Sequence, residues 1–322
     1  MPNAGITLWS GTDICDRLDF HSELRRSFPQ LLSLRDLQVI LADVVNREVI
    51  QRSEGAIAAA AEYVDTFVPT SAYEKTWAIL RQHNFAVLHG PAEMGKTAVA
   101  WMIALNQITQ GWDAIVCQSP EDYFKSVDEK RSQIFIADDA FGRTEYDPTA
   151  VFKWEKQLHY ILQRLDPKHW LIWTSRKHLL ERARQSMDLQ SKAGAFPSPG
   201  AVLVDASKLS LTEKALILYR HSKHSVLTRE RRELVKQQAL DIVRNPDFTP
   251  ERIRRFVVER LPTLMDEGGH ALIAPEQLQA EVAEAISNPT KRMRTSFIAL
   301  DKQQKALLIS MLEAYRDRRR VN

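Results

Sequence analysis

The stretch of sequence that decides the fold reads Gly90-Pro91-Ala92-Glu93-Met94-Gly95-Lys96-Thr97. It follows the short apolar run Phe85–His89 and precedes a segment whose apolar residues recur at helical spacing. A glycine-flanked turn between a buried strand and a helix directs several backbone N–H groups at one point, with the positive end of the helix behind them. The stretch therefore predicts a loop that binds phosphate.

Two side chains at the end of this loop predict which phosphate compound binds. Lys96 has the length and charge to reach the β and γ phosphates of a nucleotide, and the Thr97 hydroxyl is suited to ligate magnesium. The glycine spacing is specific, because a chance match in a chain of this length is expected on the order of 1%. We therefore expect ATP and Mg²⁺ as cofactors.

A pair of carboxylates ends the apolar run Gln133–Ala137. Asp138 is expected to hold the magnesium, and Asp139 stands where many related ATPases carry a glutamate that orients the attacking water. The side chain of aspartate is one methylene shorter than that of glutamate. We therefore expect either that Asp139 acts as a weaker base, or that the protein hydrolyses nucleotide slowly and uses it as a switch. The alternative, an acidic start of an ordinary loop, is weakened by the phosphate-binding loop nearby.

Polar residues also follow a later apolar run, His169–Trp173. Thr174, Ser175 and Arg176 are expected at the carboxyl end of a strand, where open α/β sheets place ligand contacts. They are candidates to sense the γ phosphate. The alternative is that they form an ordinary helix cap followed by a surface arginine. Further on, Arg252 is a candidate to reach the nucleotide from a helical lid, although the neighbouring Glu251 and Arg255 have the spacing of an ordinary surface ion pair.

The order of apolar runs predicts the fold class. Runs at 85–89, 113–117, 133–137, 169–173 and 201–204 alternate with helical segments, which is typical of an α/β protein with a parallel sheet covered on both faces. Between the last two runs, 182–200 lacks periodicity and is expected to be a surface loop. After Val204 the pattern is helical, with capping residues predicted at Ser210, Thr249 and Asp301.

Length suggests several domains, since single cores stop growing near about 250–300 residues and the chain has 322. We expect a helical N-terminal segment or linker over 1–66, which is alternatively the tail of an effector domain. An NTPase core over 67–205, a helical lid over 206–287 and the start of a winged-helix-like or helical unit over 288–322 are expected to follow. No apolar run approaches the roughly 20 residues that cross a bilayer, so a cytoplasmic location without membrane contact is expected.

Several segments, in order, resemble the STAND class of P-loop NTPases, and most closely its novel STAND group. The likeness is carried by 67–73, by the loop 88–97, by 138–146, by 174–176, by 211–221 and by 248–256. It implies a P-loop sheet of the additional-strand class, with the Thr174 strand between the strands of the P-loop and of Asp138. It also implies adenine held near Phe67–Tyr73, Asp138 as the magnesium ligand, Arg176 as the phosphate sensor and nucleotide-controlled assembly into a homo-oligomer.

The predicted site follows from the residues and the likeness together. Catalytic roles are expected for Lys96, Asp138, Asp139 and Arg176, and metal binding for Thr97 and Asp138. The nucleotide contacts are expected from Gly90, Pro91, Ala92, Glu93, Met94, Gly95, Lys96, Thr97, Ala98, Tyr73, Ser175 and Arg252.

Two departures from the likeness concern the ends of the chain. STAND proteins usually continue into a long sensor domain. We therefore expect either that this sequence is a fragment of a longer protein, or that the sensor or effector is another molecule. Residues 5–31 resemble only the tail of a nuclease domain, and no nuclease activity is expected.

Three functions are compatible with this sequence. The first is a slowly hydrolysing switch that controls oligomerisation or an effector, plausibly in defence against phage or foreign DNA. The second is a DNA-associated AAA-type loader or motor that uses the basic end Arg316–Arg320, although the net charge of +3 is too small to demand nucleic acid. The third is a structural adaptor that binds nucleotide without hydrolysing it.

Overall fold

The computed structural model describes residues 47–187, 199–262, 275–287 and 297–321. The chain divides into two compact units, Met1–Ser225 and Val226–Asn322. The predicted likeness of 5–31 to a nuclease tail and the boundary predicted near 288 lie outside the described residues.

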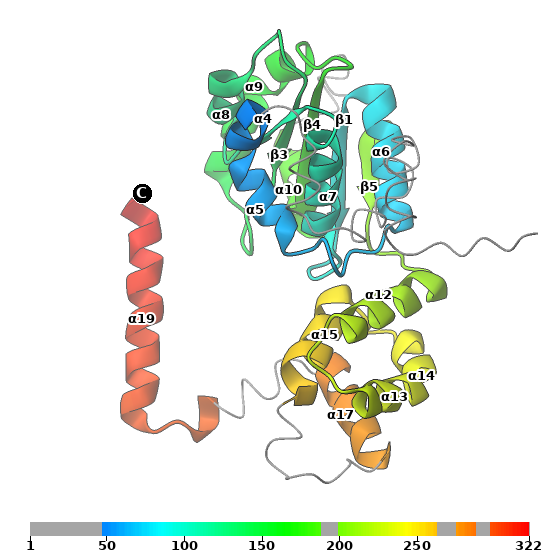
Figure 1. The fold of residues 1–322 in the computed structure, drawn as a ribbon. Helices are drawn as coiled ribbons and strands as arrows, with labels where there is room; N and C mark the ends of the chain where they lie inside the picture. The colour runs from blue at the N-terminus through cyan, green and yellow to red at the C-terminus, as the bar shows by residue number, and fades with distance from the viewer. Residues whose placement is uncertain (1–46, 188–198, 263–274, 288–296, 322) are drawn as a thin grey trace, which may run out of the picture. The chain divides into compact units, whose positions relative to one another are not determined.

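The first unit is built around a five-stranded parallel sheet with helices on both sides (Figure 1). Its strands are β1 (Phe85–Gly90), β2 (Asp113–Val116), β3 (Gln133–Ala137), β4 (His169–Arg176) and β5 (Leu203–Asp205). Its helices are α4 (Arg47–Arg52), α5 (Glu54–Ala61), α6 (Ser71–His83), α7 (Lys96–Ile108), α8 (Pro120–Ser126), α9 (Pro148–Leu162), α10 (Lys177–Ser186), α11 (Pro199–Val202) and α12 (Leu211–Lys223).

The strand order is β2-β3-β4-β1-β5. β4 pairs in parallel with β1 on one side and with β3 on the other. The strand of Thr174 therefore lies between the P-loop strand and the Asp138 strand, and the expected additional-strand order is confirmed. This order brings the carboxyl ends of β1, β3 and β4 to one edge of the sheet, where ligand sites of open α/β sheets form.

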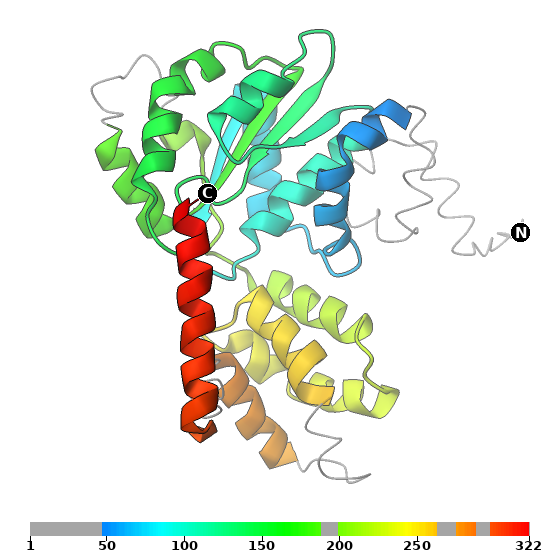
Figure 2. The ribbon, with the colours of Figure 1, turned by 90° about the vertical axis from the view of Figure 1, so that its left-hand side faces the viewer.

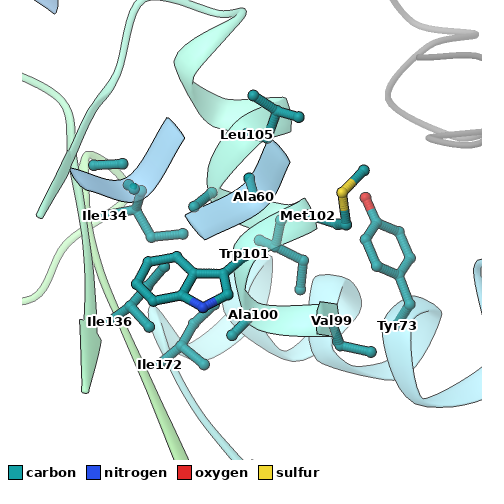
Figure 3. Close-up of a cluster of buried hydrophobic side chains, with 14 of the residues drawn as sticks. Ala60, Tyr73, Val99, Ala100, Trp101, Met102, Leu105, Ile134, Ile136 and Ile172 are labelled. Carbon is teal, nitrogen blue, oxygen red and sulfur yellow. The ribbon is translucent and has the colours of Figure 1, made fainter. Parts of the chain in front are cut away.

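Two hydrophobic clusters hold the helices against opposite faces of the sheet. One cluster joins α4, α5, α6 and α7 to strand residues that point to one face of the sheet, such as Leu88, Ile136 and Ile172 (Figure 3). The other joins α8, α9 and α10 to the residues that alternate with these, such as Phe85, Phe135 and Trp173. Because successive strand residues face opposite sides, the continuous apolar runs are explained by burial on both faces.

The helices before Phe67 are part of this packing. Val49, Ala56 and Ala60 are buried in the cluster around α7. Ser53, at the junction of α4 and α5, accepts a hydrogen bond from the backbone N–H of Ala114 at 2.9 Å, which satisfies a donor of the edge strand β2. The N-terminal segment thus extends the sheet unit, at least from Arg47.

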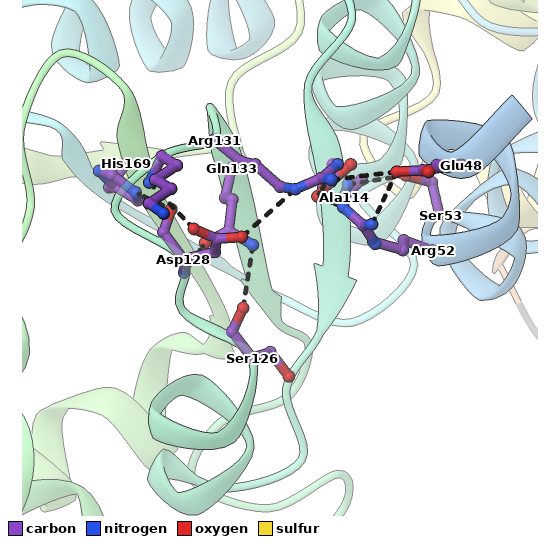
Figure 4. A network of polar contacts seen from close by, with 11 residues as sticks. Glu48, Arg52, Ser53, Ala114, Ser126, Asp128, Arg131, Gln133 and His169 are labelled. Carbon is purple, nitrogen blue, oxygen red and sulfur yellow. Dashed lines mark hydrogen bonds and ion pairs between the residues drawn. The ribbon is translucent and has the colours of Figure 1, made fainter. Parts of the chain in front are cut away.

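A polar network reinforces the same attachment (Figure 4). The guanidinium of Arg52 donates to Oδ2 of the buried Asp113 at 3.2 Å and to Glu48 at 3.0 Å. Arg131, in the loop before β3, also donates to Glu48 at 3.0 Å. Shared carboxylates therefore connect α4 to β2 and to the amino end of β3.

Two sequence predictions were wrong near β5. Residues 182–186 belong to α10, because Leu179, Leu180 and Ala183 recur at helical spacing and are buried against the sheet. Ala201 and Val202 belong to the short helix α11, so the strand begins at Leu203. Of the predicted loop, 188–198 lies outside the described residues.

The described residues of the second unit are helical. They form α13 (Arg229–Gln237), α14 (Ala239–Arg244), α15 (Pro250–Arg254), the π-helix η2 (Arg255–Arg260), α17 (Pro275–Ser287) and α19 (Lys302–Val321). The caps predicted at Thr249 and Asp301 are present, since their side chains accept hydrogen bonds from the N–H groups of Arg252 and Gln304. Figure 2 shows these helices from a second direction. In the described parts of both units, no helix is long and apolar enough to span a membrane.

Candidate nucleotide site

The phosphate-binding loop runs from the end of β1 into the first residue of α7. Gly95, just before the helix, has φ +80°, a left-handed conformation that is readily available only to glycine. The turn lets α7 begin at Lys96, so the free N–H groups of its first turn lie next to the loop backbone. The loop and the helix together provide the donors that an anion needs.

Lys96 lies under the loop and is only 7% exposed. Its ammonium donates to the carbonyl oxygen of Pro91 at 2.6 Å and to that of Gly90 at 3.3 Å. Burial lowers the pKa of Lys96, whereas the charges of Asp139 and Asp138 act in the opposite direction. The lysine is therefore held between the loop and the carboxylates, in position to meet a polyphosphate.

Asp138 is oriented by two threonine hydroxyls from different elements. The Thr97 hydroxyl, on α7, donates to Oδ1 of Asp138 at 3.0 Å. The Thr174 hydroxyl, on β4, donates to the same oxygen at 2.5 Å. The three side chains thus converge at the carboxyl edge of the sheet.

This donor set fits magnesium. Mg²⁺ prefers hard oxygen ligands, commonly one or two carboxylates together with waters and substrate phosphates. Thr97 and Asp138 offer a hydroxyl and a carboxylate within hydrogen-bond distance of each other, beside the loop expected to bind phosphates. The predicted metal ligands are therefore brought together.

Asp139 has a different environment from its neighbour. Its φ of +51° is left-handed, and its backbone N–H donates to the Thr174 hydroxyl at 2.9 Å. Burial and the adjacent Asp138 raise the pKa of Asp139, while Lys96, Arg176 and Arg143 lower it. The carboxyl group is thus partly desolvated and lies within the field of three cations, as expected of a group that handles a proton or a water.

The structure separates the remaining β4 candidates. Arg176 pairs with Gly90 in the register of β4 and β1, so it ends its strand beside the loop. Ser175 is fully buried, and its hydroxyl donates to the carbonyl oxygen of Arg176 at 3.2 Å. Arg176 therefore remains a candidate to contact phosphate. A contact between Ser175 and the nucleotide stays a prediction, and it would require the Ser175 side chain to become accessible.

Tyr73 and Arg252 were also expected to contact the nucleotide. Tyr73 is 2% exposed and packs against Phe67 and Trp77, and burial raises its pKa. Arg252 belongs to the second unit, where its guanidinium donates to the carbonyl oxygen of Ile286 at 2.7 Å. Both nucleotide contacts stay predictions.

The sequence indicated a different role for Thr174 and did not single out Arg143. Thr174 was expected to sense phosphate, yet its hydroxyl bridges Asp138 and Asp139, and its carbonyl oxygen accepts a hydrogen bond from the N–H of Ala140 at 3.0 Å. Arg143 acts on the charge of Asp139 from the loop after β3. The only signal in the sequence is that both lie within segments that carry the family likeness.

The loop after the acids depends on one glycine. Gly142 has φ +111°, and a Cβ atom there would lie 2.0 Å from the carbonyl oxygen of Glu145. We expect Gly142→Ala to destabilise the first unit by about 2–4 kcal/mol, because both backbone strain and a backbone clash must be relieved. Chemical denaturation followed by tryptophan fluorescence measures this loss.

A matched control separates strain from clash. Gly111 is also left-handed, with φ +83°, but a Cβ atom there would meet nothing within 4 Å. Gly111→Ala should therefore cost only about 1 kcal/mol. Equal losses in the two variants would contradict the role assigned to the clash at Glu145.

The sheet order, the glycine loop before α7 and the aspartate after β3 define the chain as a P-loop NTPase. The sequence family described as Novel STAND NTPase 3 matches residues 67–224. The NTPase domain of this chain therefore belongs to the novel STAND NTPases, and the resemblance read from the sequence is confirmed. No curated protein matches the chain.

Two solved structures are similar at low identity. The structure of C. elegans PCH-2 shares 13% identity over 80% of this chain and 73% of its own, with a TM-score of 0.37. Domain III of the Thermotoga maritima replication initiation protein DnaA shares 13% identity over 69% of this chain and 94% of its own, with a TM-score of 0.41. The family assignment depends on the sequence match and on the site, not on these two structures.

Proposed function

We propose that this protein is an ATP-dependent switch that binds ATP with Mg²⁺, hydrolyses it slowly and changes its assembly with the bound nucleotide. The observation that carries the proposal is the convergence of Thr97, Asp138 and Thr174 beside Lys96. A structural adaptor that only bound Mg–nucleotide would use Thr97 and Asp138 but would not need Asp139, the second carboxylate, whose backbone is held by the Thr174 hydroxyl.

Each residue of the site has a proposed task. Lys96 would move from the loop carbonyls to the β and γ phosphates, where its charge offsets that of the leaving ADP. Thr97 and Asp138 would hold the magnesium ion, which neutralises phosphate charge when bound. Arg176 would contact the γ phosphate from the end of β4.

Asp139 would orient the attacking water and accept its proton. Its side chain is one methylene shorter than a glutamate, and its backbone is fixed by the hydrogen bond to Thr174. The reach toward a water at the γ phosphate is therefore limited. This geometry supports slow turnover, which suits a protein whose output is a lasting conformational state.

Control of an effector, and a role in defence against phage or foreign DNA, are the finer parts of this proposal. They are supported by the membership of the NTPase domain in the novel STAND family. Assembly into a homo-oligomer is proposed on the same ground.

Two measurements on the wild-type chain test the proposal. Multiple-turnover release of phosphate from Mg–ATP is expected at a low rate, and its complete absence would favour an adaptor. Mass measurement of the particle is expected to give a larger assembly with a non-hydrolysable ATP analogue than with ADP. An identical mass in both states would contradict nucleotide-controlled assembly.

A further inference from the structure

One carboxylate in the first unit caps two helices that are far apart in the sequence. Glu213, in the first turn of α12, accepts hydrogen bonds from the backbone N–H groups of Ser210 and Ser71, both at 2.5 Å. Ser210 is the N-cap of α12, and its hydroxyl accepts from the N–H of Glu213 in return, which completes a capping box. Ser71 is the first residue of α6 and lies 142 residues before Glu213.

The start of α6 depends on this distant carboxylate. The first N–H groups of a helix have no partner within the helix, and its N-terminus carries a partial positive charge. Within the described chain, the N-cap residue Thr70 makes no side-chain capping hydrogen bond. Burial alone would raise the pKa of Glu213, but the hydrogen bonds from Ser210 and Ser71 outweigh it and lower that pKa. Glu213 therefore supplies both an acceptor and a negative charge to α6.

α6 is packed against the helix that carries the phosphate-binding residues. Tyr73 of α6 lies in the same buried cluster as Val99 and Met102 of α7 (Figure 3). The side-chain amide of Asn106, also on α7, donates to the Tyr73 hydroxyl at 3.4 Å. Because α7 begins at Lys96 and close-packed interiors transmit strain, a shift of α7 at its phosphate end acts on α6.

A second contact joins the start of α12 to the phosphate-binding loop. The N–H of Ala206, just after β5, donates to the carbonyl oxygen of His89 at 2.8 Å. A Cβ atom on Gly90 would lie 3.4 Å from the backbone nitrogen of Ser207. The segment that leads into α12 therefore lies against Gly90, whose carbonyl oxygen accepts from the Lys96 ammonium. The start of α12 is thus held by two independent contacts, one on α6 and one on the loop.

We propose that Glu213 is a positioning residue that couples the nucleotide bound in the first unit to α12 and to the unit that follows it. The inference rests on the proposed function, because it takes the nucleotide as the signal. The chain leaves α12 at Lys223 and enters the second unit at Val226. A change in the position of α12 therefore acts on the connection between the two units.

The signal would begin at Lys96. A ligand shifts such a joint only by interacting differently with its two states, and ATP differs from ADP by the γ phosphate. Lys96 would leave the carbonyl oxygens of Gly90 and Pro91 to meet that phosphate, which changes the loop on which Ala206 and Ser207 lie. Displacement of α12 from α6 then breaks a cap that serves both helices, so the joint has a capped and an uncapped state.

Two substitutions break the bridge from opposite sides. Ser71→Pro removes the N–H that donates to Glu213, and proline is favoured at the first position of a helix. The preceding Thr70 is extended, with φ −100° and ψ 167°, as a residue before proline prefers. In the wild type, Ser71 and Ser210 donate to different oxygens of Glu213. Glu213→Gln keeps one acceptor oxygen and therefore loses one of the two caps.

Ser210→Ala is the matched control. It removes the hydroxyl that accepts from the N–H of Glu213, so it weakens the cap of α12. The carboxylate bridge to Ser71 remains, so coupling should persist. Loss of coupling in this variant as well would show that the stability of α12 alone decides the effect, and would overturn the role assigned to the bridge.

Hydrogen exchange of the full chain with Mg–ADP and with a non-hydrolysable ATP analogue decides the proposal. In the wild type, amides of 229–260 should exchange at rates that differ by about fivefold or more between the two nucleotides. The difference should fall below about twofold in Ser71→Pro and in Glu213→Gln, although both variants still bind nucleotide.

Two results would overturn the proposal and leave nucleotide binding standing. One is a wild type that binds both nucleotides with no difference in exchange over 229–260. The other is an undiminished difference in either Ser71→Pro or Glu213→Gln. A wild-type chain that binds no nucleotide would overturn the proposed function together with this inference.

Discussion

Lys96→Ala is expected to lower the affinity for Mg–ATP by about 100-fold or more. Its ammonium is buried against the loop and would make charge-assisted hydrogen bonds to the phosphates, each worth about 1.5–3 kcal/mol. Two such bonds correspond to a loss of at least that size, because about 1.4 kcal/mol is a factor of ten. Isothermal titration with Mg–ATP measures the change.

A second lysine provides the control for net charge. Lys168 is exposed and precedes β4, at the amino end of the sheet. Lys168→Ala removes the same charge from the chain and should change the affinity by less than about twofold. Comparable losses in the two variants would mean that Lys96 acts through overall charge and not through contact.

Asp139→Asn is expected to reduce phosphate release by about 100-fold or more while making the nucleotide-free protein more stable. The loss of turnover follows because an amide cannot accept the proton of the attacking water. The gain in stability follows because Asp139 is partly buried beside Asp138, an environment that raises its pKa. We expect about 1 kcal/mol at neutral pH, since partial exposure screens the charge.

The sign of this stability effect depends on pH. The pKa of Asp139 in the folded state lies above its ordinary value of 3.8. Ionisation of this carboxyl group therefore lowers the free energy of unfolding only at pH values above about 3.8. The advantage of Asp139→Asn should therefore vanish in acid, grow as pH rises through the raised pKa and stay constant above it. Denaturation curves at several pH values measure the difference.

The control for Asp139→Asn is Asp241→Asn. Asp241 is exposed on α14 in the second unit. This change should alter neither turnover nor stability appreciably. An Asp139→Asn variant that is less stable than the wild type at neutral pH would contradict the desolvation assigned to Asp139.

The sheet and the phosphate-binding loop could be predicted because their signals are local. A continuous apolar run such as Ile134–Ala137 is typical of a strand buried on both faces, and Gly95-Lys96-Thr97 opens a helix whose first turn binds anions. The strand order is not local, and it was inferred from the family likeness. The register of β4 with β1 and β3 confirms it.

The environments of single side chains could not be predicted in the same way. Ser175 and Tyr73 were expected to contact nucleotide, but both are buried. Ser175 pairs with His89 in the register of β4 and β1, and the Tyr73 hydroxyl accepts a hydrogen bond from Asn106, so the partners of both are distant in the chain. The attachment of α4 and α5 to β2 depends on the pairing of Ser53 with Ala114, which no spacing along the sequence indicates. The helical residues 182–186 were missed because the glycines and prolines that follow them suggested a longer loop.

An experimental structure of the chain with Mg²⁺ and a non-hydrolysable ATP analogue tests the proposed nucleotide site most directly. The triphosphate is expected on Gly90–Thr97, with Lys96 at the phosphates and the metal beside Thr97 and Asp138. Asp139 should face the γ phosphate. A nucleotide bound elsewhere, or a metal held without Thr97 and Asp138, would contradict the proposed site.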